Sequence, residues 1–182
     1  MKSVLISIQP YWVFLIIAKK MGWKIDKEKT KEVRKSFPKD EDWNRQAEIY
    51  CSKDKKSFNL IPKEYQPFME KFLGKVVGRF TCDKVLEWKY LNGLNDENEK
   101  EYWIISKDGH ATCLTYDEIE NYGKGKTLYG WHITDLKIYD KPKSLEMFPI
   151  GKIARDCGCG GYMVYDKVLT RPPQSWCYVE VN

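Results

Sequence analysis

The segment from Lys29 to Ser36, Lys-Thr-Lys-Glu-Val-Arg-Lys-Ser, combines an acid with several bases in what we expect to be a β-strand. Side chains alternate across a strand, so the segment should present two faces. One predicted face carries Thr30, Glu32, Arg34 and Ser36, and the other carries Lys29, Lys31, Val33 and Lys35. A strand used only for packing has at least one apolar face, and this one has none. We therefore expect it to line a binding or catalytic site.

The charged residues of this strand are the candidates for chemistry. Burial and neighbouring cations would both lower the pKa of Lys29, which would suit a base or a nucleophile. The same cations would also bind a phosphate with no shifted pKa. Arg34 offers a planar fork to a phosphate or a base edge, and Glu32 either holds Arg34 in an ion pair or accepts a hydrogen bond from a nucleobase. Lys29 and Glu32 are the catalytic candidates, and Thr30 and Lys35 join them as binding candidates.

Aromatic side chains provide the second half of a predicted base-binding site. They make up 14% of the chain, and they can stack on bases as well as fill a core. The aromatic candidates are Trp12, Trp131, Trp176 and Tyr178, with Trp12 and Trp176 preferred, although a single tryptophan is more often a core residue. Ser175 could donate a hydrogen bond to a phosphate or a base. The chain's two histidines, His110 and His132, suit structural roles better than that of a general base.

Charge is concentrated at the start of the chain. Residues 1–40 contain ten Lys and Arg residues against four Asp and Glu residues, whereas the whole chain has a formal net charge of +5. A local basic patch fits a polyanionic partner, RNA or DNA, although such runs are also common on solvated surfaces. The apolar stretch 3–18 is interrupted at Gln9-Pro10 and is too short to span a bilayer. We expect no membrane partner and a cytoplasmic location.

The pattern of elements predicts an α+β protein. We expect strands over 4–8, 48–52, 74–82, 129–139 and 162–168 and near 176–181, with helices over 10–20, 62–72 and 116–122. Thr115 and Glu118 form a capping-box pattern before the last helix. Many strands with few helices indicate a small mixed β-barrel with peripheral helices. The 182 residues suit one domain, with insertions near 39–72 and 88–103.

The cysteines give no clear metal site. Six are spread along the chain, and only Cys157 and Cys159 lie close together in sequence. Zinc ligands usually have two to four residues between paired cysteines, so a one-residue spacer is a poor match. We expect free thiols, no bound metal and no cofactor.

The opening of the chain resembles that of ASCH domains, which belong to the PUA-like superfamily of small β-barrels. The resemblance rests on Val4-Leu5-Ile6-Ser7-Ile8-Gln9-Pro10, a following helix, and Lys29-Thr30-Lys31-Glu32-Val33-Arg34-Lys35. The closing Pro172-Pro173-Gln174-Ser175-Trp176 is similar to ASCH-like proteins of bacteria and their phages. The resemblance implies a cleft that receives a nucleotide, or a base of RNA or DNA, with Lys29, Thr30, Glu32 and Arg34 on its motif.

Two departures from the family pattern bear on activity. The usual glycine before the motif is absent, because Asp26-Lys27-Glu28 stands there. Some small ASCH relatives are amidohydrolases of acetylated cytidine with a Lys and a Thr in this strand, and Glu32 occupies the position of that catalytic Thr.

Three functions therefore remain open. The first is binding of nucleic acid or a nucleotide in a basic, aromatic-lined cleft. The second is an enzyme on the same scaffold, either a ribonuclease or an amidohydrolase of modified nucleosides. The third is a protein-binding factor, such as a phage-encoded inhibitor. We favour the first, because the residues argue for a site but do not form a complete catalytic set.

Overall fold

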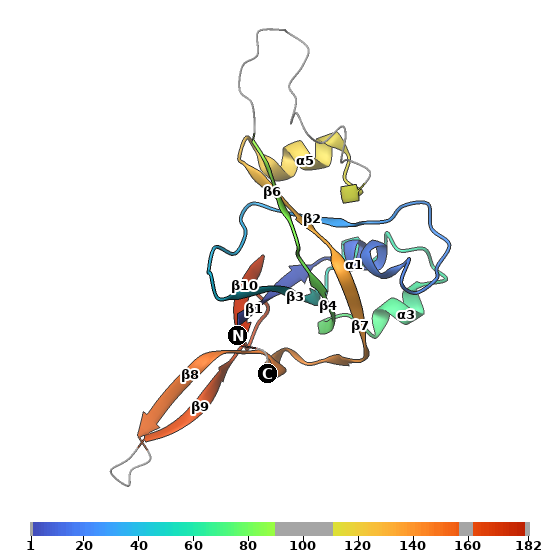
Figure 1. The fold of residues 1–182 in the computed structure, drawn as a ribbon. Helices are drawn as coiled ribbons and strands as arrows, with labels where there is room; N and C mark the ends of the chain where they lie inside the picture. Colours follow the sequence, from blue (N-terminus) through green and yellow to red (C-terminus); the bar gives the residue numbers. More distant parts are fainter. Residues whose placement is uncertain (1, 90–110, 157–161, 181–182) are drawn as a thin grey trace.

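The structure is a computed structural model that describes residues 2–89, 111–156 and 162–180 (Figure 1). Its main sheet has five strands in the order β10-β1-β3-β4-β7. These strands are β1 (Lys2–Ile8), β3 (Trp43–Cys51), β4 (Lys75–Thr81), β7 (Thr134–Lys143) and β10 (Trp176–Glu180). β1 runs parallel to β3, and the other neighbouring pairs are antiparallel. The first and last described strands are thus neighbours in one sheet.

The other described strands form two smaller sheets. One has the order β2-β6-β5, and the other is the hairpin β8–β9, which extends away from the main sheet (Figure 1). Their bounds are β2 (Lys31–Arg34), β5 (Val85–Trp88), β6 (Leu128–His132), β8 (Pro149–Asp156) and β9 (Tyr162–Val168). The predicted α+β class is confirmed. The described strands form no closed barrel, so the barrel part of the prediction is not confirmed.

Helix α1 (Pro10–Ile17) packs its apolar residues into the main core. Pro10 stands at its first turn, where the missing N–H costs nothing. Residues 13–17 of α1 are all buried, with the β1 and β3 side chains, in one hydrophobic cluster. None of the described helices is long and apolar enough to cross a membrane.

The remaining helices are short. Those with bounds among the described residues are α2 (Lys55–Phe58), α3 (Gln66–Glu70), α5 (Tyr116–Gly123) and the 3₁₀ turn Leu145–Met147. α5 begins with the predicted capping box: Thr115 Oγ1 accepts from the Glu118 N–H, and Glu118 Oε2 accepts from the Thr115 N–H. Residues 39–72, predicted as an insertion, include β3 in the middle of the main sheet. Residues 90–103 and the pair Cys157 and Cys159 lie outside the described residues.

Several predicted bounds were wrong. The predicted strand 129–139 is two strands in different sheets: β6 ends at His132, β7 begins at Thr134, and Asp135 has a positive φ of 47°. The first helix ends at Ile17 rather than near Lys20, and it is followed by turns. The strand predicted from 29 to 36 is only Lys31–Arg34. β8 was not predicted.

Candidate functional site

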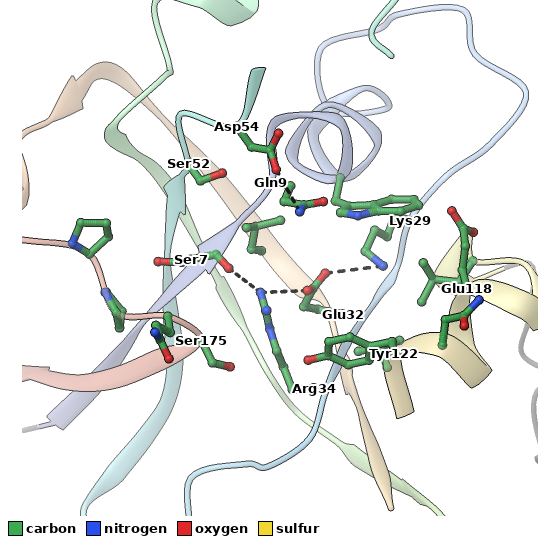
Figure 2. A pocket seen from close by; sticks show the side chains of 18 residues that line it. Ser7, Gln9, Lys29, Glu32, Arg34, Ser52, Asp54, Glu118, Tyr122 and Ser175 are labelled. Carbon is green, nitrogen blue, oxygen red and sulfur yellow. Dashed lines mark hydrogen bonds and ion pairs between the residues drawn. The ribbon is translucent and has the colours of Figure 1, made fainter. Parts of the chain in front are cut away.

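A pocket of about 640 Å³ lies where several elements meet, between the end of β1, the start of α1, β2 and α5. The segment 172–175, which leads into β10, closes another side. Figure 2 shows Ser7, Ser52 and Ser175 on one side and Lys29, Glu118 and Tyr122 on the other, with Glu32 and Arg34 between them. The volume is within the usual range for small-molecule sites.

Lys29, Glu32 and Arg34 form a continuous chain of charged groups in this pocket (Figure 2). Arg34 Nη2 lies 2.9 Å from Glu32 Oε1, and Lys29 Nζ lies 3.5 Å from Glu32 Oε2. Arg34 Nη2 also donates to the Ser7 carbonyl at 2.6 Å, which ties β2 to the end of β1. Their side chains are 2%, 7% and 11% exposed in chain order, so these ion pairs are largely shielded from water.

Lys29 can approach Glu32 because it lies before β2 and is not part of that strand. Its N–H donates to the Leu15 carbonyl at 3.4 Å, and the next N–H, of Thr30, donates to the Ala111 carbonyl at 2.9 Å. The alternation of a strand begins only at Lys31. The prediction that Lys29 lies on the face opposite Glu32 and Arg34 was therefore wrong, whereas the shared face of Glu32 and Arg34 is confirmed by their ion pair.

The environment of Lys29 lowers the pKa of its ammonium below the usual value. Burial is the main cause of a lowered pKa; Glu32 opposes the shift, and Arg34 adds to it. The ammonium donates to the Thr112 carbonyl at 2.7 Å and lies 5.1 Å from the centroid of the Trp12 ring. The predicted direction of the Lys29 pKa shift is confirmed, with burial rather than like charge as the larger cause.

Four polar atoms at the pocket are buried without a hydrogen-bond partner. Across the described residues only five buried side-chain polar atoms are in this condition, and four of them belong to residues that line the pocket. These four are Ser7 Oγ, Glu32 Oε2, Arg34 Nε and Ser52 Oγ, of which Glu32 Oε2 still has its ion pair with Lys29. A buried polar group without a partner costs about 1–3 kcal/mol, so such a cluster is typical of a site that a ligand completes.

The pocket is less basic than predicted. Two cations, Lys29 and Arg34, line it together with three carboxylates, Glu32, Asp54 and Glu118. Asp54 accepts hydrogen bonds from Gln9 and from the Ser57 N–H, where it caps α2. With this balance the interior suits an uncharged ligand with polar edges better than a phosphate.

The predicted residues divide into two groups. Trp12, Lys29, Glu32, Arg34 and Ser175 line the pocket together. The others predicted for the site do not line it: Thr30, Lys35, Trp131, Trp176 and Tyr178. Lys35 still lies near the rim, with its ammonium 4.8 Å from the centroid of the Tyr122 ring, and Tyr122 is a lining residue.

Three of the predicted aromatic residues pack together instead. Trp131 is fully buried, and its ring centroid lies 6.0 Å from that of Trp176. Trp176 contacts Tyr178 edge-on at 5.5 Å, and its indole N–H donates to Ser36 Oγ. The Tyr178 hydroxyl accepts from the Asp40 N–H. These rings hold β10 and β6 against the core, whereas Trp12 alone of the four lines the pocket.

The sequence prediction missed Ser7, Ser52, Asp54, Glu118, Asn121 and Tyr122. One signal was available, because Glu118 and Tyr122 are four residues apart and so share a face of a predicted helix. The serines carried no such signal.

Comparisons with known proteins identify the fold. No family model matches the chain, and no curated protein matches it in sequence. The crystal structure of ASCH from Zymomonas mobilis matches with a TM-score of 0.55 and 15% identity over 98% of this chain and 87% of that chain. A mutant of that protein, in which a phenylalanine replaces a tyrosine, matches with a TM-score of 0.56 and 15% identity over 99% and 91%. A serine-to-alanine mutant gives a TM-score of 0.56 and 14% identity over 98% and 88%.

Proposed function

We propose that this chain, which has the fold of ASCH domains, binds a nucleobase in the pocket between α1, β2 and α5. The base belongs to a nucleoside, or to an unpaired nucleotide of RNA or DNA. One observation supports the proposal: Ser7 Oγ, Arg34 Nε and Ser52 Oγ are buried at the pocket without a hydrogen bond, and among the described residues Glu32 Oε2 has only its 3.5 Å ion pair with Lys29. The edges of bases carry many hydrogen-bond donors and acceptors, so a bound base would supply partners for these four atoms.

The chemistry of the lining supports a base rather than a phosphate. Glu32 Oε2 can accept from an exocyclic amine, and Arg34 Nε can donate to a ring nitrogen or a carbonyl oxygen. Trp12 and Tyr122 offer aromatic surface, and stacking contributes about 1–3 kcal/mol per base. The three carboxylates of the lining would repel a phosphate placed inside.

Calorimetric titration with cytidine, uridine, adenosine, guanosine and N4-acetylcytidine tests this proposal. Ser7→Ala is the sharpest variant, because Ser7 Oγ has no hydrogen bond to lose within the described structure. Folding should be unaffected, yet a hydrogen bond to the ligand would be lost, with about a tenfold fall in affinity. Glu32→Gln should lower the affinity by tenfold or more, since it removes a charged acceptor.

Glu28→Gln is the matched control for Glu32→Gln, because Glu28 is exposed on the surface and pairs with Lys19. It should bind like the wild type. If the wild type binds neither these nucleosides nor a single-stranded oligonucleotide, or if Ser7→Ala and Glu32→Gln bind as well as the wild type, the pocket is not a base site.

The environment of Lys29 supports a second candidate function, hydrolysis of an acylated nucleoside in the same pocket. A buried lysine with a lowered pKa, 3.5 Å from a carboxylate, is suited to proton transfer. Water would attack the acyl carbon, the C–N bond would break, and the products would be a carboxylic acid and the free exocyclic amine. Glu32 would remove a proton from the water, and Lys29 would give one to the leaving nitrogen.

Chromatography of N4-acetylcytidine incubated with the protein tests this activity. We expect cytidine and acetate from the wild type and at least a hundredfold slower release from Lys29→Met, because general acid–base catalysis contributes about 10²–10⁴-fold. Absence of product from the wild type would remove this activity and leave base binding. A labelled RNA incubated in parallel tests the alternative of a ribonuclease.

A further inference from the structure

A second groove, of about 440 Å³, adjoins the base pocket. The two share the lining residues Ser52 and Pro172, so they lie on either side of these residues. The groove runs between the end of β3, the start of β4 and the segment after β9, and its charged lining residues are Lys53, Lys75, Arg171 and Glu146.

The charge of this groove differs from that of the pocket. The lining of the groove contains three cations and one carboxylate. All three cations are exposed, and none forms an ion pair with a described residue. The Glu146 carboxylate is already engaged, since hydrogen bonds from its own N–H and from Ser144 lower its pKa. An anion is therefore favoured in the groove and disfavoured in the pocket.

The aliphatic stem of Lys53 lies over the backbone at Gly74. Gly74 has a φ of +74°, in the left-handed region, and its N–H donates to the Cys51 carbonyl at 2.8 Å. The Lys53 side chain lies directly over Gly74, where a Cβ atom would overlap Lys53 Cε. A lysine stem that rests on backbone in this way loses less conformational entropy when its ammonium binds a ligand.

Ser52 connects the two spaces. Its hydroxyl is buried without a hydrogen bond, and the residue lines both the pocket and the groove. A group at this junction would contact the sugar or the phosphate that follows a base held in the pocket, as hydroxyls commonly do in nucleic-acid complexes.

We infer that the groove of Lys53, Lys75 and Arg171 binds the phosphate backbone next to the base in the pocket. The ligand of the site is then a nucleotide within a single strand rather than a free nucleoside. This inference rests on the proposed base binding and adds the part of the ligand that lies outside the pocket. The supporting observation is that a basic groove lies next to a pocket whose lining includes three carboxylates.

Fluorescence anisotropy with labelled single-stranded ten-nucleotide RNA and DNA, over a series of salt concentrations, tests the inference. The test variant is Lys53→Gln/Lys75→Gln/Arg171→Gln. The control is Lys55→Gln/Lys56→Gln/Lys63→Gln, which removes three exposed cations that do not line the groove. Thermal melting should show that both fold, because every substituted residue is exposed.

The groove variant should bind the oligonucleotide at least tenfold more weakly at low salt. The slope of log K against log salt should become shallower by about 2, since each phosphate contact in a single strand contributes about 0.7. Its affinity for the preferred nucleoside should be unchanged, and the control should match the wild type in both assays. A preference for RNA over DNA would indicate a contact to the 2′-hydroxyl.

Two results would overturn the inference while leaving base binding intact. One is a groove variant that binds the oligonucleotide with wild-type affinity and salt slope. The other is a wild type that binds nucleosides but not oligonucleotides. Failure of both nucleosides and oligonucleotides to bind would overturn base binding as well.

Discussion

At the scale of single residues, the chain keeps several ionisable groups away from water. Lys29 and Glu32 are buried at the pocket, and Glu48 is buried in the main sheet, where it is 1% exposed. Tyr139 donates a hydrogen bond of 2.5 Å to Glu48 Oε2. Burial raises the pKa of Glu48, and the Tyr139 hydrogen bond opposes the shift only in part.

The raised pKa of Glu48 predicts a pH-dependent effect of Glu48→Gln. Ionised Glu48 is less favourable in the folded state than in the unfolded state, so its contribution to stability is lost as the pH rises from about 4.5 through the folded-state pKa. Glutamine stays neutral and can still accept from Tyr139. Urea denaturation should therefore show Glu48→Gln more stable than the wild type by about 1 kcal/mol at pH 8, with a smaller difference at pH 5.

Glu70→Gln, at an exposed site on α3, controls for the removal of a carboxylate. A stability difference between Glu48→Gln and the wild type that is the same at both pH values, or larger at pH 5, would contradict the argument.

The site residues differ in how far the sequence could reveal them. Glu32 and Arg34 were predictable together, because alternation places them on one face of a polar strand. Lys29 was identified as a candidate but assigned to the wrong face, since no local pattern marks where β2 begins. Ser7 and Ser52 each follow a mainly apolar strand segment and resemble ordinary strand ends. Only the tertiary structure shows that their hydroxyls are buried and unpartnered.

At the scale of elements, α5 connects the stability of the fold to the pocket. Its buried residue Ile119 packs with Val33, Trp88 and Leu128, and its exposed side supplies Glu118, Asn121 and Tyr122 to the lining. The helix is only eight residues long, so its first turn depends strongly on the cap at Thr115.

Thr115→Ala should lower the free energy of unfolding by about 1 kcal/mol, because it removes the side-chain acceptor for the Glu118 N–H. Binding to the pocket should weaken too, as Glu118 and Tyr122 lose their fixed position. Thr115→Ser keeps a hydroxyl and should restore most of both properties. Urea denaturation and nucleoside titration measure the two effects. Equal losses in the Ser and Ala variants would show that the cap is not the cause.

The elements also show what local sequence can predict. The capping box and α5 were predicted closely, because caps are read from a few adjacent residues. Strand β9 matched its predicted range of 162–168. The division of 129–139 into β6 and β7 was not predicted, since both halves have strand-forming residues and the change of sheet depends on pairing with β2 and β4. Barrel closure is likewise a matter of long-range pairing.

At the scale of the whole molecule, the hairpin β8–β9 is built differently from the rest. Every residue of β9 is exposed, including Tyr162 at 77% and Val164 at 62%. The hairpin is joined to the body at its base, where Phe148 is buried with Leu5, Tyr50 and Val76. Isolated two-stranded sheets are marginal in water, so this anchor must hold the ribbon in place.

Two variants test the contributions of the anchor and of the ribbon to stability. Tyr162→Thr/Val164→Thr changes one face of β9, and it should alter the free energy of unfolding by less than about 1 kcal/mol, because exposed single substitutions usually stay within about 0.5. Phe148→Ala should cost about 3–5 kcal/mol through the cavity it leaves. Urea denaturation of both variants measures the difference. A loss of several kcal/mol in the β9 variant would mean that the ribbon packs against the body and does not extend away from it as in Figure 1.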